Sequence, residues 1–141
     1  MLVRAMVGLA LWVAATPALA ADEAGDEALR VKSMEQATEF WGCLNGSDQI
    51  LRAAKMQPER YQMGMRGLCL EEERRFLDGF RAYLLSIGRG SLSLADNEEI
   101  TAGTVRKMVT QIADRRAALV STYVIWFEAA ADAAKQTSAA N

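Results

Sequence analysis

Apolar residues recur every three or four positions through most of the chain, and no stretch shows the strict alternation of a half-buried strand. Only two prolines, Pro17 and Pro58, interrupt this pattern. Such spacing places apolar side chains along one face of an α-helix. The pattern therefore predicts an all-α protein, and the short connections between its long segments predict an antiparallel three-helix bundle.

The first helix is expected at 26–56, and its apolar face is wide enough to contact two neighbours. The stretch Asn45-Gly46-Ser47-Asp48 contains weak helix formers and two capping residues. This composition predicts either a kink or a break of the first helix near Asn45-Gly46.

The second helix is expected at 58–87, because proline fits the first turn of a helix and Gly88-Arg89-Gly90-Ser91 ends the periodic pattern. Asp96 or Asn97 is expected to cap the third helix. The bundle domain is predicted to cover residues 21–134. Residues 135–141 have the composition of a disordered tail.

The first twenty residues have the pattern of a secretory signal peptide. Arg4 precedes an apolar run, and the small-residue pattern Ala18-Leu19-Ala20 predicts cleavage after Ala20. A retained membrane anchor is the alternative, but the run is shorter than the roughly 20 apolar residues that span a bilayer. We expect a periplasmic or secreted protein without stable membrane insertion.

The charge balance argues against two classes of partner. The formal net charge is −2 at pH 7, and it becomes −3 when Arg4 leaves with the signal peptide. Nucleic acids and anionic membranes both require a concentrated positive field. We therefore expect no nucleic-acid partner, whereas a protein partner is compatible with this charge.

The two cysteines, Cys43 and Cys69, are predicted to form a disulfide between the first and second helices. Counted from the turn before Pro58, both lie roughly 16 to 20 Å along their antiparallel helices, so they reach the same height. Redox catalysis is the sharper alternative, but it usually needs a Cys-x-x-Cys spacing that the chain lacks. Pairing between two copies is a further alternative that the even number of cysteines disfavours.

Glu72 lies on the apolar stripe of the second helix, where an unpaired carboxylate is costly. Arg115 and Arg116 are expected at a similar height on the third helix, so a buried Glu72–Arg116 or Glu72–Arg115 ion pair is predicted. The alternative is that Glu72 sits at the edge of the stripe, on a solvated charged face.

Met56, Met63 and Met65 cluster near the same turn, and thioether sulfur is a soft ligand suited to Cu(I). Met63 and Met65 are two positions apart, so they point to nearly opposite sides of a helix. Packing is therefore the favoured role for these methionines. We expect no cofactor.

Five consecutive apolar residues, Tyr123-Val124-Ile125-Trp126-Phe127, encircle the third helix. A three-helix core cannot cover every side of that helix. The candidates for a partner-binding surface are Tyr123, Ile125, Trp126 and Phe127, which would serve a partner or a second copy of the chain. The favoured alternative is that the first helix or the N-terminal segment covers them.

The chain has no histidine. This absence excludes Ser-His-Asp and Cys-His machinery, and the scattered carboxylates show no pair that the pattern places in a cleft. We therefore expect a protein that is not an enzyme.

Phe40-Trp41-Gly42-Cys43-Leu44, followed by Leu68-Cys69-Leu70-Glu71-Glu72-Glu73, resembles a pattern in small uncharacterised exported helical proteins of proteobacteria. In that pattern an aromatic-x-Cys helix precedes a Cys-x-x-Glu helix, and the likeness covers about a third of the chain. The architecture is also similar to that of periplasmic acid-stress chaperones and of helical immunity proteins. The cysteine spacing and the length differ from the chaperones, and the chain lacks the glycine-containing stretch of the immunity proteins.

Together these patterns predict a non-enzymatic exported protein that acts by protein binding, in envelope-stress protection or toxin neutralisation. The alternative is a carrier of a small ligand or of Cu(I).

Overall fold

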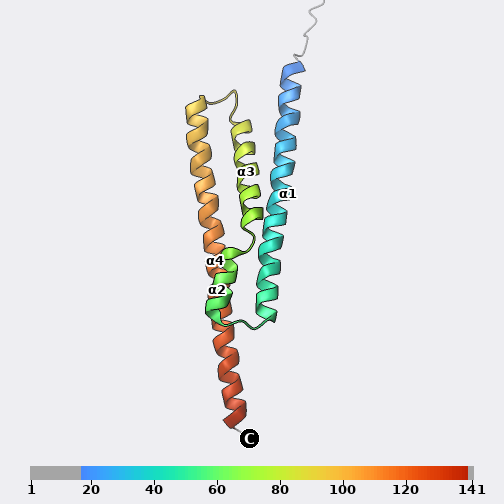
Figure 1. Cartoon of the computed structure of the whole chain (residues 1–141). Coiled ribbons are helices and arrows are strands. Elements are labelled where there is room, and N and C mark those ends of the chain that lie inside the picture. Colours follow the sequence, from blue (N-terminus) through green and yellow to red (C-terminus); the bar gives the residue numbers. More distant parts are fainter. Residues whose placement is uncertain (1–16, 140–141) are drawn as a thin grey trace, which may run out of the picture.

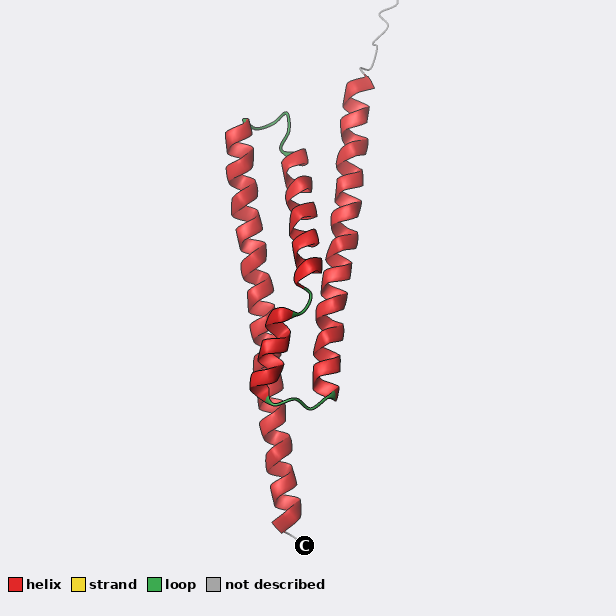
Figure 2. Cartoon of the chain, viewed as in Figure 1, coloured by secondary structure: helices red, strands yellow, loops and turns green. Residues whose placement is uncertain are grey.

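A computed structural model describes residues 17–139, which form four α-helices joined by short connections (Figures 1 and 2). These are α1 (Pro17–Ala53), α2 (Pro58–Gly67), α3 (Leu70–Ile87) and α4 (Leu94–Ala139). No strand occurs within this part of the chain. The all-α prediction is therefore confirmed, but there are four helices in place of three, because the predicted second helix is divided.

The division lies at Leu68 and Cys69. Leu68 is extended, with φ −88° and ψ 151°, and Cys69 has a left-handed backbone with φ 63°. This conformation costs a residue other than glycine about 1–2 kcal/mol, so neighbouring contacts must hold it. Cys69 is bonded to α1 through its sulfur, and the Leu68 carbonyl accepts a hydrogen bond from Arg116 of α4. Neither contact can be seen in the local sequence.

α1 is one continuous helix through Asn45-Gly46 and its ribbon shows no sharp bend (Figure 1), so the expected kink or break is not there. Leu44 and Leu51, on either side of this stretch, are both buried in the core. Packing against neighbours overrides a weak local helix propensity in this way. α1 begins at Pro17, and the predicted cleavage point after Ala20 lies in its first turn. The rest of the predicted signal peptide, residues 1–16, lies outside the described residues.

Each long helix has different neighbours along its length. α1 packs along α3, and its C-terminal half also contacts α2. α4 packs on α2 in one half of the molecule and on α3 in the other (Figure 1). The buried apolar side chains form one cluster around the α2–α3 junction: Phe40, Leu44, Leu51, Tyr61, Met65, Cys69, Phe76, Ile112, Leu119 and Tyr123.

The connection between α3 and α4 is fixed by Asn97. Its Nδ2 donates a hydrogen bond to the Leu85 carbonyl at 2.9 Å. Asn97 thus caps the end of α3, whereas α4 starts earlier, where the Ser93 hydroxyl accepts from the Asp96 N–H at 3.2 Å. Gly88 faces Asn97 so closely that a β-carbon at position 88 would lie 2.0 Å from the Asn97 Oδ1.

The last turns of α4 extend past the other helices (Figure 1), and residues 128–139 are all exposed. α4 is helical as far as Ala139, so it includes residues 135–139 of the expected disordered tail. Among the described helices, none has the length together with the apolar character that crossing a membrane requires.

Candidate functional site

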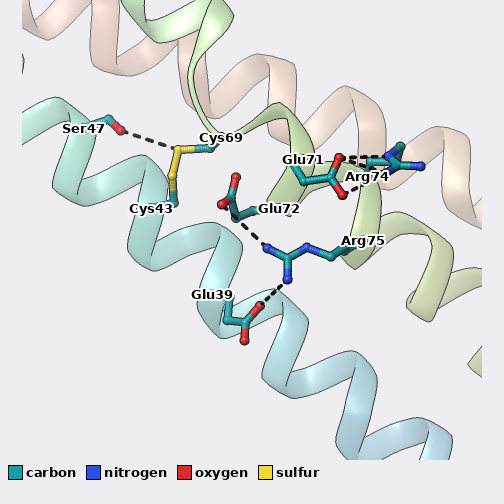
Figure 3. A network of polar contacts seen from close by, with 8 residues as sticks. All are labelled: Glu39, Cys43, Ser47, Cys69, Glu71, Glu72, Arg74 and Arg75. Carbon is teal, nitrogen blue, oxygen red and sulfur yellow. Dashed lines mark hydrogen bonds and ion pairs between the residues drawn. A yellow bond between two sulfur atoms is a disulfide. The ribbon is translucent and has the colours of Figure 1, made fainter.

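The predicted disulfide is present. Cys43 of α1 and Cys69 at the α2–α3 junction are bonded, with their Cα atoms 5.9 Å apart (Figure 3). The Ser47 hydroxyl lies 3.5 Å from the Cys69 sulfur. The Glu72 carboxylate lies close by, with its ligand atom and the two sulfur atoms within 4.8 Å of one another. A cysteine binds a metal ion as a thiolate. The two sulfur atoms here are bonded to each other and are not thiolates, so this group is a structural cross-link.

Glu72 pairs with a residue of its own helix. Its carboxylate lies 3.6 Å from the Arg75 guanidinium, and Arg75 also reaches Glu39 of α1 at 3.5 Å (Figure 3). The Glu72 side chain is 31% exposed. Glu72 therefore lies at the edge of the apolar stripe, which agrees with the alternative to a buried ion pair.

The interhelical ion pair joins Arg116 to Glu73, one position away from the predicted Glu72. Arg116 Nη1 lies 2.5 Å from Glu73 Oε2, with the two side chains 14% and 17% exposed. Arg116 Nη2 also donates to the Leu68 carbonyl at 3.2 Å. Arg115 is exposed and has no ion pair among the described residues. The predicted pairing is wrong by one position. The left-handed Cys69 changes the rotational phase of α3 relative to α2, and this change turns position 73 towards α4.

A cluster of aromatic and polar side chains, which the sequence pattern does not predict, joins α1, α2 and α4. Tyr61 and Tyr123 are both fully buried, and their rings stack with centroids 3.9 Å apart. Tyr61 donates its hydroxyl hydrogen bond to Asp48, and Tyr123 donates to the Met56 carbonyl at 2.5 Å.

Arg52 completes this cluster. Its Nε donates to Asp48 Oδ1 at 2.6 Å, and its Nη2 donates to the Leu119 carbonyl of α4 at 3.4 Å. The guanidinium carbon lies 5.8 Å from the centroid of the Tyr61 ring and 5.4 Å from that of Tyr123, within reach of a cation–π interaction. The four-residue spacing of Asp48 and Arg52 is the one sequence signal for this cluster.

Burial sets the ionisation of both tyrosines. It raises the pKa of the Tyr61 hydroxyl well above its usual range, and the hydrogen bond to Asp48 raises that pKa further. Burial also raises the pKa of Tyr123, with the nearby Arg52 acting in the opposite direction. Both hydroxyls are therefore neutral donors at ordinary pH, and their role is to hold three helices together.

The apolar segment at 123–127 is covered on one side only. Tyr123 is buried and Phe127 is half-buried, whereas Ile125 is 66% exposed and Trp126 is 42% exposed. Lys55, in the connection after α1, meets Trp126 and Phe127 across a small hollow. The expected full coverage is therefore wrong for Ile125 and Trp126.

The three methionines near the α1–α2 connection differ in burial. Met65 is fully buried, whereas Met63 is 66% exposed. Met56 is half-buried against the core. The opposite burial of Met63 and Met65 agrees with their spacing of two positions, which argues against a shared soft-metal site on α2.

A groove opens where α1 and α4 diverge, beyond the point at which Arg116 lies over the Phe40 ring. We call it the upper groove. Its volume is about 310 Å³. α3 forms its floor, and Met34, a lining residue on α1, is 57% exposed. The main apolar lining residues are Met34, Ala37, Trp41, Phe80, Tyr83 and Met108.

The upper groove and the exposed Ile125–Trp126 surface are two of the places where large apolar side chains remain accessible beside the core. Both are typical of contact surfaces. Comparisons of the chain with protein-family models, with curated proteins and with solved structures yield no match.

Proposed function

We propose that this protein is a non-enzymatic, exported protein that acts by binding another protein, and that an amphipathic helix of the partner docks in the upper groove. The observation that carries the proposal is the accessible apolar groove between α1 and α4, with Met34 57% exposed at its edge. Export to the periplasm is supported by the signal-peptide pattern of the first twenty residues and by the disulfide, which persists in oxidising compartments.

The shape and chemistry of the groove favour a helix. In this half of the molecule α3 contacts both α1 and α4, so a further helix laid between α1 and α4 would complete a bundle. Methionine and aromatic side chains line the groove, and such side chains adapt well to an incoming apolar face. Burial of an apolar helix face in a groove is a common mode of peptide recognition.

Charge defines the partner further. Arg30 lines the groove, although Glu27 pairs with it. Arg115 is exposed and lies seven positions after Met108, which puts both on the same face of α4. Arg115 has no ion pair in the described part of the chain. A helix with acidic side chains along its polar flanks would therefore suit this groove best.

The exposed Ile125–Trp126 surface is a second contact region, which serves the same partner or a second copy of the chain. Of the carrier alternatives, the Cu(I) site has the weaker support because Met63 is exposed whereas Met65 is fully buried. Envelope-stress protection and toxin neutralisation are both settings in which a small exported binder of helices would act.

A designed peptide tests the groove. The probe is a leucine-faced amphipathic helix with glutamate on its polar flanks, and the control is the same peptide with lysine for glutamate. With Trp12 removed with the signal peptide and Trp126→Phe introduced, Trp41 is the one remaining tryptophan. We expect a saturable change in Trp41 fluorescence with the acidic peptide and binding about tenfold weaker with the basic one.

Two substitutions on opposite sides of α1 give the matched control. Met34→Glu in the groove should weaken binding of the acidic peptide about tenfold or more. The new carboxylate would replace an apolar contact, compete for Arg30, which lies 3.0 Å from the Met34 sulfur, and repel the glutamates of the peptide. Ile50→Glu should have no effect, because Ile50 is 71% exposed and lies half a helical turn out of phase with Trp41. Equal binding of the two peptides, or equal loss in the two variants, would show that the groove is not the docking site.

A further inference from the structure

A second hollow lies between α2 and α4, on the flank of α4 that faces away from the upper groove. Its volume is about 520 Å³, within the range of roughly 300–1,000 Å³ that is usual for small-ligand pockets. Glu73, in the first turn of α3, also lines it. Its apolar wall is formed by Met65, Val109, Ile112, Ala113, Ala117 and Val120.

Two hydrogen-bond donors line this pocket without a polar partner. Gln62 and Arg66 lie four positions apart on α2, so they point to the same side of that helix. Neither side chain has a hydrogen bond or ion pair within residues 17–139. Arg66 is exposed, which places its guanidinium at the mouth of the pocket.

The other charged groups of the pocket neutralise each other. Glu73 and Arg116 line its inner part and form the ion pair described above. The buried Nε of Arg116 has no acceptor among the described residues, so this end of the pocket holds no excess of acceptors. The pocket therefore carries one uncompensated positive charge, at Arg66.

From this arrangement we propose that the pocket binds a small amphipathic monoanion, with an unbranched medium-chain carboxylate as the ligand class. The carboxylate accepts hydrogen bonds from Arg66 and Gln62 at the mouth, and the hydrocarbon chain lies along Met65, Ile112 and Val120. A guanidinium pairs with a carboxylate in a planar, two-pronged geometry. This activity is separate from helix binding in the upper groove, and neither depends on the other.

Methyl NMR of the methionines in the oxidised full-length protein distinguishes ligand binding in the pocket from binding in the upper groove. Met65 lines the pocket, whereas Met34 and Met108 line the upper groove. On titration with decanoate below its micelle concentration, we expect a saturable shift of the Met65 methyl and none at Met34 or Met108. Decanol and decylamine should bind about tenfold more weakly, because neither offers an anion to Arg66.

Three variants sharpen the test. Arg66→Gln should weaken decanoate binding about fivefold without changing the affinity for decanol. Arg60→Gln, another exposed arginine of α2 that does not line the pocket, should leave both unchanged. Ala117→Trp should fill the pocket and abolish binding, and Ala117 is exposed, so the fold should survive, as circular dichroism would verify.

The proposal is overturned by any of four results. These are no Met65 shift up to the solubility limit, shifts at Met34 and Met108 in its place, equal affinity for decanol and decanoate, or no effect of Arg66→Gln. Failure of the acidic peptide to bind the upper groove would leave this ligand site unaffected.

Discussion

The ring of Tyr61 in α2 stacks on the ring of Tyr123 in α4, with the two planes inclined by 11°. Each hydroxyl then bonds to the C-terminal part of α1 or to the connection that follows it, at Asp48 and at the Met56 carbonyl. The stack therefore ties three helices together at one point, and Arg52 reaches both rings.

Removing either hydroxyl should lower the free energy of unfolding. We expect Tyr61→Phe and Tyr123→Phe each to cost about 1–2 kcal/mol. Tyr123→Phe leaves the Met56 carbonyl without its side-chain donor, and Tyr61→Phe removes one of the two donors to Asp48. Urea denaturation measures the loss. Tyr83→Phe is the control, since the Tyr83 side chain is half-buried and its hydroxyl makes no hydrogen bond within the described chain. Equal stability of all three variants would contradict the role given to the stack.

Stability should fall at alkaline pH. The pKa of Tyr61 and that of Tyr123 are raised in the folded protein, so above the unfolded pKa of about 10 the unfolded chain loses protons that the folded chain keeps. The contribution of these two tyrosines to the free energy of unfolding is therefore constant below that pH and decreases above it. Urea midpoints across this range should fall less steeply in Tyr61→Phe, and parallel curves would argue against the raised pKa of Tyr61.

The disulfide should contribute a large part of the stability. Cys43→Ser with Cys69→Ser is expected to lower the free energy of unfolding by about 3.5 kcal/mol, the chain-entropy value for this loop length. Reduction of the unaltered protein should produce a similar loss in urea denaturation. Free thiols in protein purified without reducing agent would contradict the cross-link.

Two adjacent glutamates should behave differently. Glu73→Gln should cost about 1–3 kcal/mol, because it leaves the half-buried Arg116 guanidinium without its carboxylate. Glu72→Gln should change stability by less than about 0.5 kcal/mol, because its ion pair with Arg75 is long and exposed. Thermal or urea unfolding measures the loss of stability in each variant. A larger loss in Glu72→Gln than in Glu73→Gln would support the Glu72–Arg116 pairing that the sequence predicts.

Two glycine substitutions should have opposite effects on the stability of the protein. Gly88→Ala should cost about 1–3 kcal/mol, because the new methyl group would collide with Asn97 and disturb its hydrogen bond to Leu85. Gly46→Ala in the middle of α1 meets no atom within 4 Å, and alanine is the better helix former by about 0.5–1 kcal/mol. Gly46→Ala should therefore stabilise the protein, and a loss there would indicate that the helix needs the flexibility of Gly46.

The sequence predicts the parts of the fold that depend on local periodicity. The helical class follows from the spacing of apolar residues, and the Cys43–Cys69 bond follows from the matched distances of both cysteines from the turn before Pro58. Both predictions depend only on helix geometry, that is, on the rise per residue and the number of residues per turn.

The missed features depend on contacts between distant residues. Nothing near Leu68 and Cys69 requires a break, since Arg116 and Cys43 hold it from other helices. Because the break shifts the phase of α3, the choice between Glu72 and Glu73 could not be made from spacing. The upper groove was missed because the sequence does not show how far α1 and α4 diverge.

The projecting end of α4 should unfold locally more readily than the rest of the helix. From Asp132 onwards α4 is exposed and extends past the other described helices, and a helical segment this short has little stability of its own. Amide protons there should exchange with solvent far faster than those beside Tyr123, and proteases should trim α4 from this end while the core remains intact.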